Sequence, residues 1–344
     1  MIRLKYLKLS VVYLGLIIGA GFASGREILE YFVFCSAEDV TGLVAATFFF
    51  IFILYIIAST ANKYALGDFN AYVEHVAGRA AFYFKIAILL TMAAGYAVML
   101  SCSGAAARDI FGVSNLWGVL GMSALCFIIF VFDIKGFAAL SLFLVPVLVI
   151  GIGFLSVAVV LTDPAQGAFL DSLFSGAVNR NALLNAIYYV SYNTLCAAAV
   201  VVPLCQSADN KKLLITCCLA GAALGLLIFL VWLALSMNIS SVWYEDLPLL
   251  KLAGNYGELA RYAYGLILTF AIFTTAASQG LGILSYVKTK NKLARAGAAL
   301  AFCLAMIPFG LHSFSSLVAE IYRLQGLVGL VWLLMIIVKW QRRD

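Results

Sequence analysis

The sequence predicts an all-α polytopic membrane protein. Of its 344 residues, 65% are hydrophobic and 11% are charged, whereas soluble domains are about 45–50% apolar and about 25% charged. A helix needs roughly 20 apolar residues to cross a bilayer, and the chain contains ten runs near that length. They lie at about 8–34, 40–62, 82–109, 115–132, 136–161, 182–204, 212–238, 257–287, 293–309 and 313–339.

The distribution of charge predicts the orientation of these helices. If the N-terminus is cytoplasmic, 16 of the 22 Lys and Arg residues fall in cytoplasmic loops and tails, where membrane proteins collect basic residues. Only five of the 16 acidic residues fall there, so the two sides carry +11 and −5. We therefore expect a multi-pass protein of the cytoplasmic (inner) membrane with both termini cytoplasmic. Orientation explains the net charge of +6, and no nucleic-acid partner is needed.

Other features exclude several functional classes. The eight cysteines include no CxxC pair and the two histidines are far apart, so buried thiols are favoured over a disulfide or metal framework. There is no GxxxxGK[ST] nucleotide loop, which argues against ATP-driven pumping by this chain alone. No histidine cluster, nucleophile elbow or carboxylate pair indicates an enzyme, and no organic cofactor is expected.

The ten helices divide into two sets of five, and a repeat with an odd number of helices inserts in opposite orientations. We expect one membrane domain made of a first repeat at 1–161, a linker at 162–181, and a second repeat with a cytoplasmic tail at 182–344. The first helix of each half is interrupted. The first carries the stretch Gly19 to Gly25 followed by Arg26 and Glu27, and the sixth carries Ser191-Tyr192-Asn193-Thr194 at its midpoint.

Matching interruptions are typical of inverted-repeat secondary transporters, whose broken helices hold substrate and ions at the bilayer midplane. Unwound backbone is tolerated in a membrane only where it lines a cavity or is buried in protein. The alternative is that the glycines serve only close helix packing. These features resemble the LeuT-fold amino acid–polyamine–organocation superfamily of transporters. The stretch GAGFASGREILEYF, residues 19–32, is similar to the YkvI-type predicted amino acid permeases.

Backbone ends at the first-helix break predict a substrate site. Free N–H groups near Ser24, Gly25 and Arg26 suit a carboxylate, and carbonyls near Ile18 and Gly19 suit an ammonium group or a cation. An α-amino acid carries both charges, and the resemblance implies the same class of ligand. The predicted substrate-binding residues are Gly19, Gly21, Phe22, Ala23, Ser24, Gly25, Tyr96, Tyr188, Tyr192 and Asn193. The assignment of Tyr96 comes from the resemblance. The alternative for each tyrosine is that it only packs in the core or at the membrane interface.

The eighth helix predicts a sodium site. Ala271, Thr274 and Thr275 place a carbonyl and two hydroxyls on one helical face, and the resemblance implies that backbone carbonyls of Gly15 and Ile18 complete the set. The alternative is that both hydroxyls bond to their own helix. Related sodium-independent proteins place a lysine from the fifth helix in this space, and the run 136–161 contains none. Na⁺ is therefore the expected coupling ion, with a proton as the alternative.

The resemblance implies a gate among the charges in the outer half of the helices. In relatives, an arginine after the first-helix break pairs with an acid on the tenth helix, which implies Arg26–Glu320 or Glu27–Arg323 here. A local pair between Glu320 and Arg323 is the simpler alternative.

The loop at 245–248 is a re-entrant lid or an ordinary solvated loop. We predict that the protein takes up a small amino acid or related amine-bearing solute by alternating access. The alternatives are a proton-coupled or uncoupled permease, or a channel or sensor on the same scaffold. The oligomeric state stays open.

Overall fold

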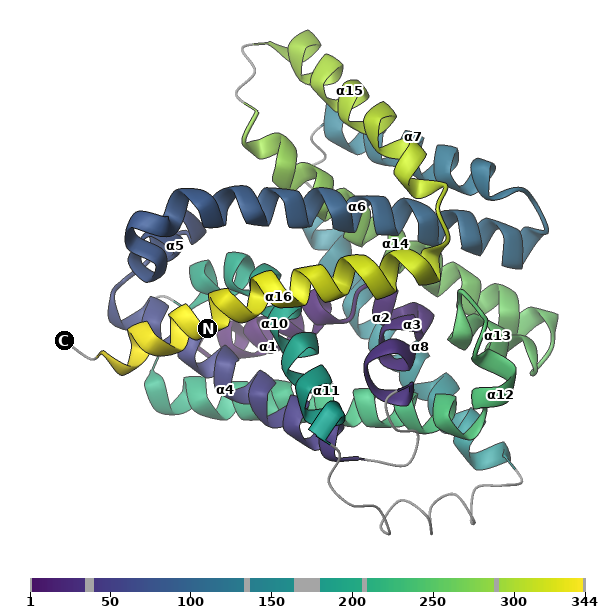
Figure 1. Ribbon diagram of the computed structural model, residues 1–344, viewed down its shortest axis with the longest axis horizontal. Helices are drawn as coiled ribbons and strands as arrows, with labels where there is room; N and C mark the ends of the chain where they lie inside the picture. The colour runs from purple at the N-terminus through teal and green to yellow at the C-terminus, as the bar shows by residue number, and fades with distance from the viewer. Residues whose placement is uncertain are drawn as a thin grey trace.

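The computed structural model describes residues 2–34, 40–132, 137–163, 180–205, 209–287 and 291–342, and within these ranges it contains helices and no β-strand (Figure 1). The elements are α1 (Ile2–Ile17), α2 (Ala20–Ser24), α3 (Arg26–Ile28), the π-helix η1 (Leu29–Val33), α4 (Thr41–Lys63), α5 (Phe69–Ala77), the 3₁₀ turn η2 (Gly78–Ala80), α6 (Ala81–Phe111), α7 (Asn115–Phe132), α8 (Phe137–Thr162), α10 (Arg180–Leu204), α11 (Asn210–Met237), α12 (Ile239–Val242), α13 (Pro248–Gly254), α14 (Glu258–Ser285), α15 (Lys292–Gly310) and α16 (Phe314–Gln341).

The helices have the lengths and surfaces of a membrane protein. Among the described residues, eight helical segments are long and apolar enough to cross a bilayer. Large apolar side chains such as Phe48, Phe82 and Leu219 are each 66% exposed, as expected for side chains that face lipid. The all-α membrane class is therefore confirmed. The other two predicted spans correspond to the α1–η1 segment and α10, so the count of ten and the five-plus-five repeat stay predictions. The predicted linker falls almost entirely outside the described residues.

The first span is discontinuous, as its glycines predict. Helix α1 ends at Ile17, and Ile18 and Gly19 form a bend before α2 begins. A second interruption follows at Gly25, whose φ of 83° is left-handed and separates α2 from α3. Glycine adopts this conformation without the steric penalty that a Cβ atom brings. The π-helix η1 then completes the segment.

The predicted break in the sixth span is wrong, because α10 runs as one helix from Arg180 to Leu204. Its polar side chains form hydrogen bonds with backbone carbonyls of the same helix. The hydroxyls of Ser191 and Thr194 donate to the carbonyls of Ile187 and Val190, and the Asn193 amide donates to the carbonyl of Tyr189. Each bond reaches back four residues, a pattern that leaves the backbone hydrogen bonds intact.

The interrupted segment lies inside the bundle. Helix α1 packs against α8, α10 and α11, whereas α2 contacts α14 and α3 contacts α16. Helices α7 and α15 pack on α6 and on each other, at one edge of the molecule (Figure 1). Helix α10 also packs along α16, where Gly326 lies against Tyr188 and Gly329 lies against the backbone of Ser191 and Tyr192. This arrangement brings α10, α14 and α16 around the break.

Candidate functional site

The break at Gly19 to Gly25 is buried, and several of its backbone N–H and carbonyl groups form hydrogen bonds. Phe22, Ala23 and Ser24 are fully buried. The Ser24 hydroxyl donates to the Gly21 carbonyl at 2.7 Å and accepts the backbone N–H of Arg26 at 3.1 Å. The Tyr264 hydroxyl of α14 donates to the Ala23 carbonyl at 2.7 Å. The N–H of Arg26, which was expected to hold a substrate carboxylate, is therefore already occupied by Ser24.

The Glu27 carboxylate occupies the space beside the break. A Cβ atom at Gly21 would overlap Oε1 of Glu27, so the absence of a side chain at position 21 makes room for this carboxylate. Oε2 accepts a hydrogen bond from the Tyr192 hydroxyl, and Tyr322 provides a second hydrogen bond. Glu27 is only 4% exposed. Among the described residues it takes part in no ion pair.

Tyr192 and Tyr322 bind this carboxylate, and Tyr31 and Tyr189 pack against Tyr192. We call these four residues the tyrosine cluster. Tyr192 stacks on Tyr31 and on Tyr322, with ring centroids 5.8 and 5.0 Å apart. Tyr189 meets the rings of Tyr31 and Tyr192 at 5.3 and 5.6 Å. All four side chains are buried. The hydroxyls of Tyr31 and Tyr189 have no hydrogen-bond partner within the described part of the chain.

The α12–α13 segment covers the break. A Cβ atom at Gly25 would lie 2.8 Å from Cγ of Leu249 and 3.3 Å from its backbone nitrogen. Arg26 donates to the carbonyls of Trp243 and Glu245 at 3.4 and 3.1 Å, and it forms an ion pair with Glu30. Helix α13 is largely buried. These contacts favour a lid over a solvated loop for residues 245–248.

Asp246 links the α12–α13 segment to the long helices α6 and α16. Its carboxylate accepts from Arg108 of α6 at 3.1 Å and from the backbone N–H of Ser315 in α16 at 3.0 Å. The Ser313 hydroxyl adds a longer contact of 3.4 Å. Burial raises the pKa of Asp246, but the hydrogen bonds from Ser315 and Arg108 outweigh it, so the pKa lies below its ordinary value.

We expect Asp246→Asn to lower the free energy of unfolding by about 1.5–3 kcal/mol at neutral pH, the usual value of hydrogen bonds to a charged group. Because the pKa is lowered in the folded protein, this stability is fully present above the ordinary Asp pKa of about 3.9. It is lost as the pH falls through the folded value. Thermal unfolding in detergent at pH 7, 5 and 3.5 measures this.

The control for this prediction is Glu245→Gln, because Glu245 and its partner Lys251 are 35% and 50% exposed. An exposed ion pair contributes about 0–1 kcal/mol. Equal melting temperatures for Asp246→Asn and the wild-type protein at pH 7 would show that Asp246 does not fasten the segment.

The predicted gate pairs are not formed in this conformation. Arg26 is paired with Glu30, and Glu27 is bound by tyrosines. Glu320 and Arg323 are exposed on α16, and neither takes part in an ion pair among the described residues, so their local pair is not formed either. The gate stays a prediction for another conformation.

The sodium-site residues are only partly brought together. The Thr275 hydroxyl lies beside Gly19, 3.3 Å from the position that a Cβ atom there would take. Ala271 is buried, and the Thr274 hydroxyl donates to the carbonyls of Phe270 and Ala271. Gly15 lies against Val145 of α8, and Ile18 is in the bend with its N–H bonded to Leu14. No group of three or more His, Cys, Asp or Glu side chains that could hold a metal ion occurs among the described residues.

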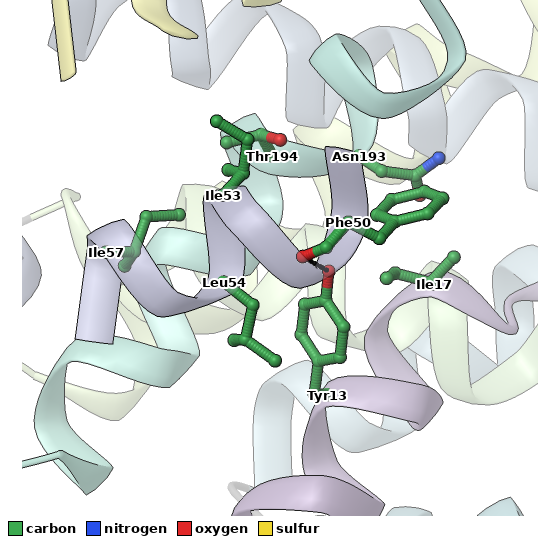
Figure 2. A pocket seen from close by; sticks show the side chains of 8 residues that line it. All are labelled: Tyr13, Ile17, Phe50, Ile53, Leu54, Ile57, Asn193 and Thr194. Carbon is green, nitrogen blue, oxygen red and sulfur yellow. Dashed lines mark hydrogen bonds between the residues drawn. The ribbon is translucent and has the colours of Figure 1, made fainter. Parts of the chain in front are cut away.

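The other predicted substrate residues lie apart from one another. The Tyr96 hydroxyl is 3.7 Å from the Cys303 sulfur of α15, and its ring packs on Phe130 and Phe302. Tyr188 packs on Gly326 of α16. Figure 2 shows Asn193 and Thr194 beside a narrow apolar gap between α1, α4 and α10, where the Tyr13 hydroxyl donates to the Phe50 carbonyl at 3.2 Å. Of the predicted tyrosines, only Tyr192 reaches Glu27.

Sequence reasoning did not include three members of the tyrosine cluster, Tyr31, Tyr189 and Tyr322. One signal was available, because Tyr31 follows Glu27 by four residues and therefore lies on the same side of a helix. The choice of Tyr188 over Tyr189 had no support in spacing, since both lie one helical turn before Tyr192.

Comparison with known proteins identifies two relatives that match nearly the whole chain. No protein-family model matches the chain. The membrane protein YkvI of Bacillus subtilis (strain 168) is 28% identical over 95% of this chain and 93% of its own length. YyaD of the same organism is 24% identical over 97% of this chain and 98% of its own length.

Solved structures of transporters share the fold. A manganese transporter variant from Eremococcus coleocola superposes with a TM-score of 0.60 at 12% identity, covering 97% of this chain and 77% of that one. A Na⁺-coupled sialic acid symporter superposes with a TM-score of 0.55 at 15% identity, covering 95% and 82%. The two solved structures are transporters and not enzymes. The chain is thus a helical membrane protein that resembles YkvI along nearly its whole length and shares its fold with these solved transporters.

Proposed function

We propose that this protein is a secondary transporter that takes up a small amine-bearing solute, an amino acid or a related compound, by alternating access. The observation that carries the proposal is the interrupted first span, buried between α10, α14 and α16 with the Glu27 carboxylate beside it. Broken membrane helices of this kind hold substrates in secondary transporters. The proposed orientation is that of the charge bias, with both termini cytoplasmic in the inner membrane.

Uptake into liposomes containing the purified protein tests this function. Radiolabelled amino acids and amines should accumulate above the empty-liposome level when a gradient of Na⁺ or of protons is imposed. The two gradients are applied separately, with choline replacing Na⁺ in the second. The function is refuted if no solute of either class accumulates under either gradient while the protein is shown to be folded.

We propose Na⁺ as the coupling ion, because the Thr275 hydroxyl lies beside the backbone of Gly19 at the break. Hydroxyl and carbonyl oxygens suit a hard cation. The fold similarity to a Na⁺-coupled symporter is in keeping with this choice.

We expect Thr275→Ala to weaken Na⁺ activation of uptake at least about tenfold, because removal of one ligand worth about 1.4 kcal/mol gives that change. The matched control is Thr269→Ala on the same helix, whose hydroxyl donates to the Gly265 carbonyl four residues earlier. The Na⁺ concentration for half-maximal uptake is the measurement. An unchanged value in Thr275→Ala would remove this residue from the sodium site.

Proton coupling is the second candidate, and Glu27 is the observation that favours it. A buried carboxylate without a cationic partner is costly unless it is neutralised, and binding a proton neutralises it. If a proton gradient alone drives uptake and Na⁺ has no effect, proton coupling replaces the sodium proposal.

A further inference from the structure

We propose that Glu27 and the tyrosine cluster bind the cationic nitrogen of the substrate, and that this site takes an amine without an adjacent carboxylate in preference to an α-amino acid. The inference rests on the proposed transport function and narrows its substrate class.

The first argument is the charge of the site. Glu27 is 4% exposed, and the cationic residue next to it, Arg26, is bound to Glu30 and to the carbonyls of Trp243 and Glu245. The described part of the chain therefore supplies hydrogen bonds to Glu27 and no ion-pair partner. A buried carboxylate in this state attracts a cation strongly, because water does not screen it.

The second argument is the surrounding aromatic rings. Tyr31, Tyr192 and Tyr322 form a stack from η1, α10 and α16, and Tyr189 closes one side. The face of an aromatic ring carries negative potential and attracts ammonium groups. Because Tyr31 and Tyr322 cover the two faces of Tyr192, the ring faces that could attract an ammonium group beside Glu27 are those of Tyr31 and Tyr322 that point away from the stack.

The third argument is the hydroxyl groups of the cluster. Those of Tyr31 and Tyr189 are buried without a hydrogen-bond partner among the described residues, and their side chains are 8% and 0% exposed. Buried polar groups are normally paired. The N–H groups of a bound ammonium would donate to Glu27 in place of the Tyr192 hydroxyl and to the free hydroxyl oxygens nearby.

The fourth argument excludes an adjacent carboxylate on the substrate. The expected seats for it are filled, since Ser24 accepts the N–H of Arg26 and Leu249 covers Gly25. The Glu27 carboxylate itself lies against Gly21. A second carboxylate on the substrate would meet a like charge at close range in a buried site, which is unfavourable.

Binding of matched pairs to the purified protein tests the proposal. The probes are isobutylamine against valine, isoamylamine against leucine, and phenethylamine against phenylalanine, each pair differing by one carboxylate and having no second cationic group. Thermal stabilisation reports binding because it grows with the ratio of ligand concentration to Kd. At pH 7 we expect at least one amine to stabilise the protein and its amino acid partner to bind at least about thirtyfold more weakly, equivalent to about 2 kcal/mol.

Variants separate binding from folding. Glu27→Gln should weaken amine binding at least about thirtyfold, as expected when one partner of a buried charge pair is removed. Tyr189→Phe removes a hydroxyl without a partner, so it should leave the unliganded melting temperature unchanged or raised and weaken amine binding about three- to tenfold. Glu258→Gln, at an exposed glutamate near the start of α14, is the control and should bind as the wild-type protein does.

Three outcomes would overturn the inference: amino acids bind and amines do not, no probe binds, or Glu27→Gln and Tyr189→Phe both bind amines with wild-type affinity. If Glu27→Gln changes only the pH dependence of uptake, the site holds a proton and the inference also fails. Amino acid uptake without amine binding would leave the transport function standing, whereas amine binding without uptake by liposomes would refute transport and retain the site.

Discussion

Gly329→Ala should destabilise the protein by about 1–3 kcal/mol or more, the usual effect of forcing a methyl group into a packed interior. The added Cβ atom would overlap the carbonyl oxygen of Ser191 and lie 2.9 Å from the backbone nitrogen of Tyr192. Both atoms belong to the backbone of α10, so no side chain can turn aside to make room. Helices α10 and α16 would have to separate, and the stacked rings of Tyr192 and Tyr322 with them.

The measurement is the free energy or midpoint of unfolding in detergent. The matched control is Gly297→Ala in α15, where an added Cβ atom meets nothing within 4 Å. Exchange of an unhindered helical glycine for alanine stabilises by roughly 0.5–1 kcal/mol. If Gly329→Ala unfolds at the wild-type midpoint, the close approach of α10 and α16 is wrong.

The membrane class was predictable because apolar runs and the side preference of basic residues are properties of local sequence. The break in the first span was predictable for the same reason. Three glycines within seven residues weaken a helix at that place in any context, and Gly25 indeed adopts the left-handed conformation. Helix α2, between the two interruptions, packs against α13 and α14, and local sequence does not reveal such contacts.

The sixth span shows the limit of the same reasoning. Ser191, Asn193 and Thr194 have side chains that bond either to a broken backbone or to the carbonyl one turn earlier. The structure has the second arrangement for all three. Sequence composition does not distinguish these cases, because the outcome depends on whether neighbouring helices leave space for an unwound turn. Gly329 of α16 lies directly against the backbone here.

The candidate site was predictable in position but not in its members. Glu27 was assigned to a gate, because the resemblance implies a charge pair between the first-helix break and the tenth helix. Its contacts with Tyr192 and Tyr322 join residues 165 and 295 positions away in the sequence, and spacing carries no information about such contacts.

Gly25→Ala should abolish most transport activity, because it combines backbone strain with a clash beneath the lid. The left-handed conformation at φ 83° costs a residue with a Cβ atom roughly 1–2 kcal/mol. The Cβ atom would in addition lie 2.8 Å from Cγ and 3.3 Å from the backbone nitrogen of Leu249. We expect uptake in liposomes to fall at least about tenfold, because destabilising the transport-competent conformation by about 1.4 kcal/mol lowers its population tenfold.

Gly112→Ala separates the two causes, because Gly112 has a similar left-handed φ of 68° and an added Cβ atom there meets nothing within 4 Å. It should lose stability from strain alone and keep wild-type uptake. The double variant Gly25→Ala/Leu249→Ala should recover part of the activity lost in Gly25→Ala, because residues in contact give non-additive effects. Activity losses that simply add would mean that Leu249 does not press on the break, and the α12–α13 segment would then be a loop and not a lid.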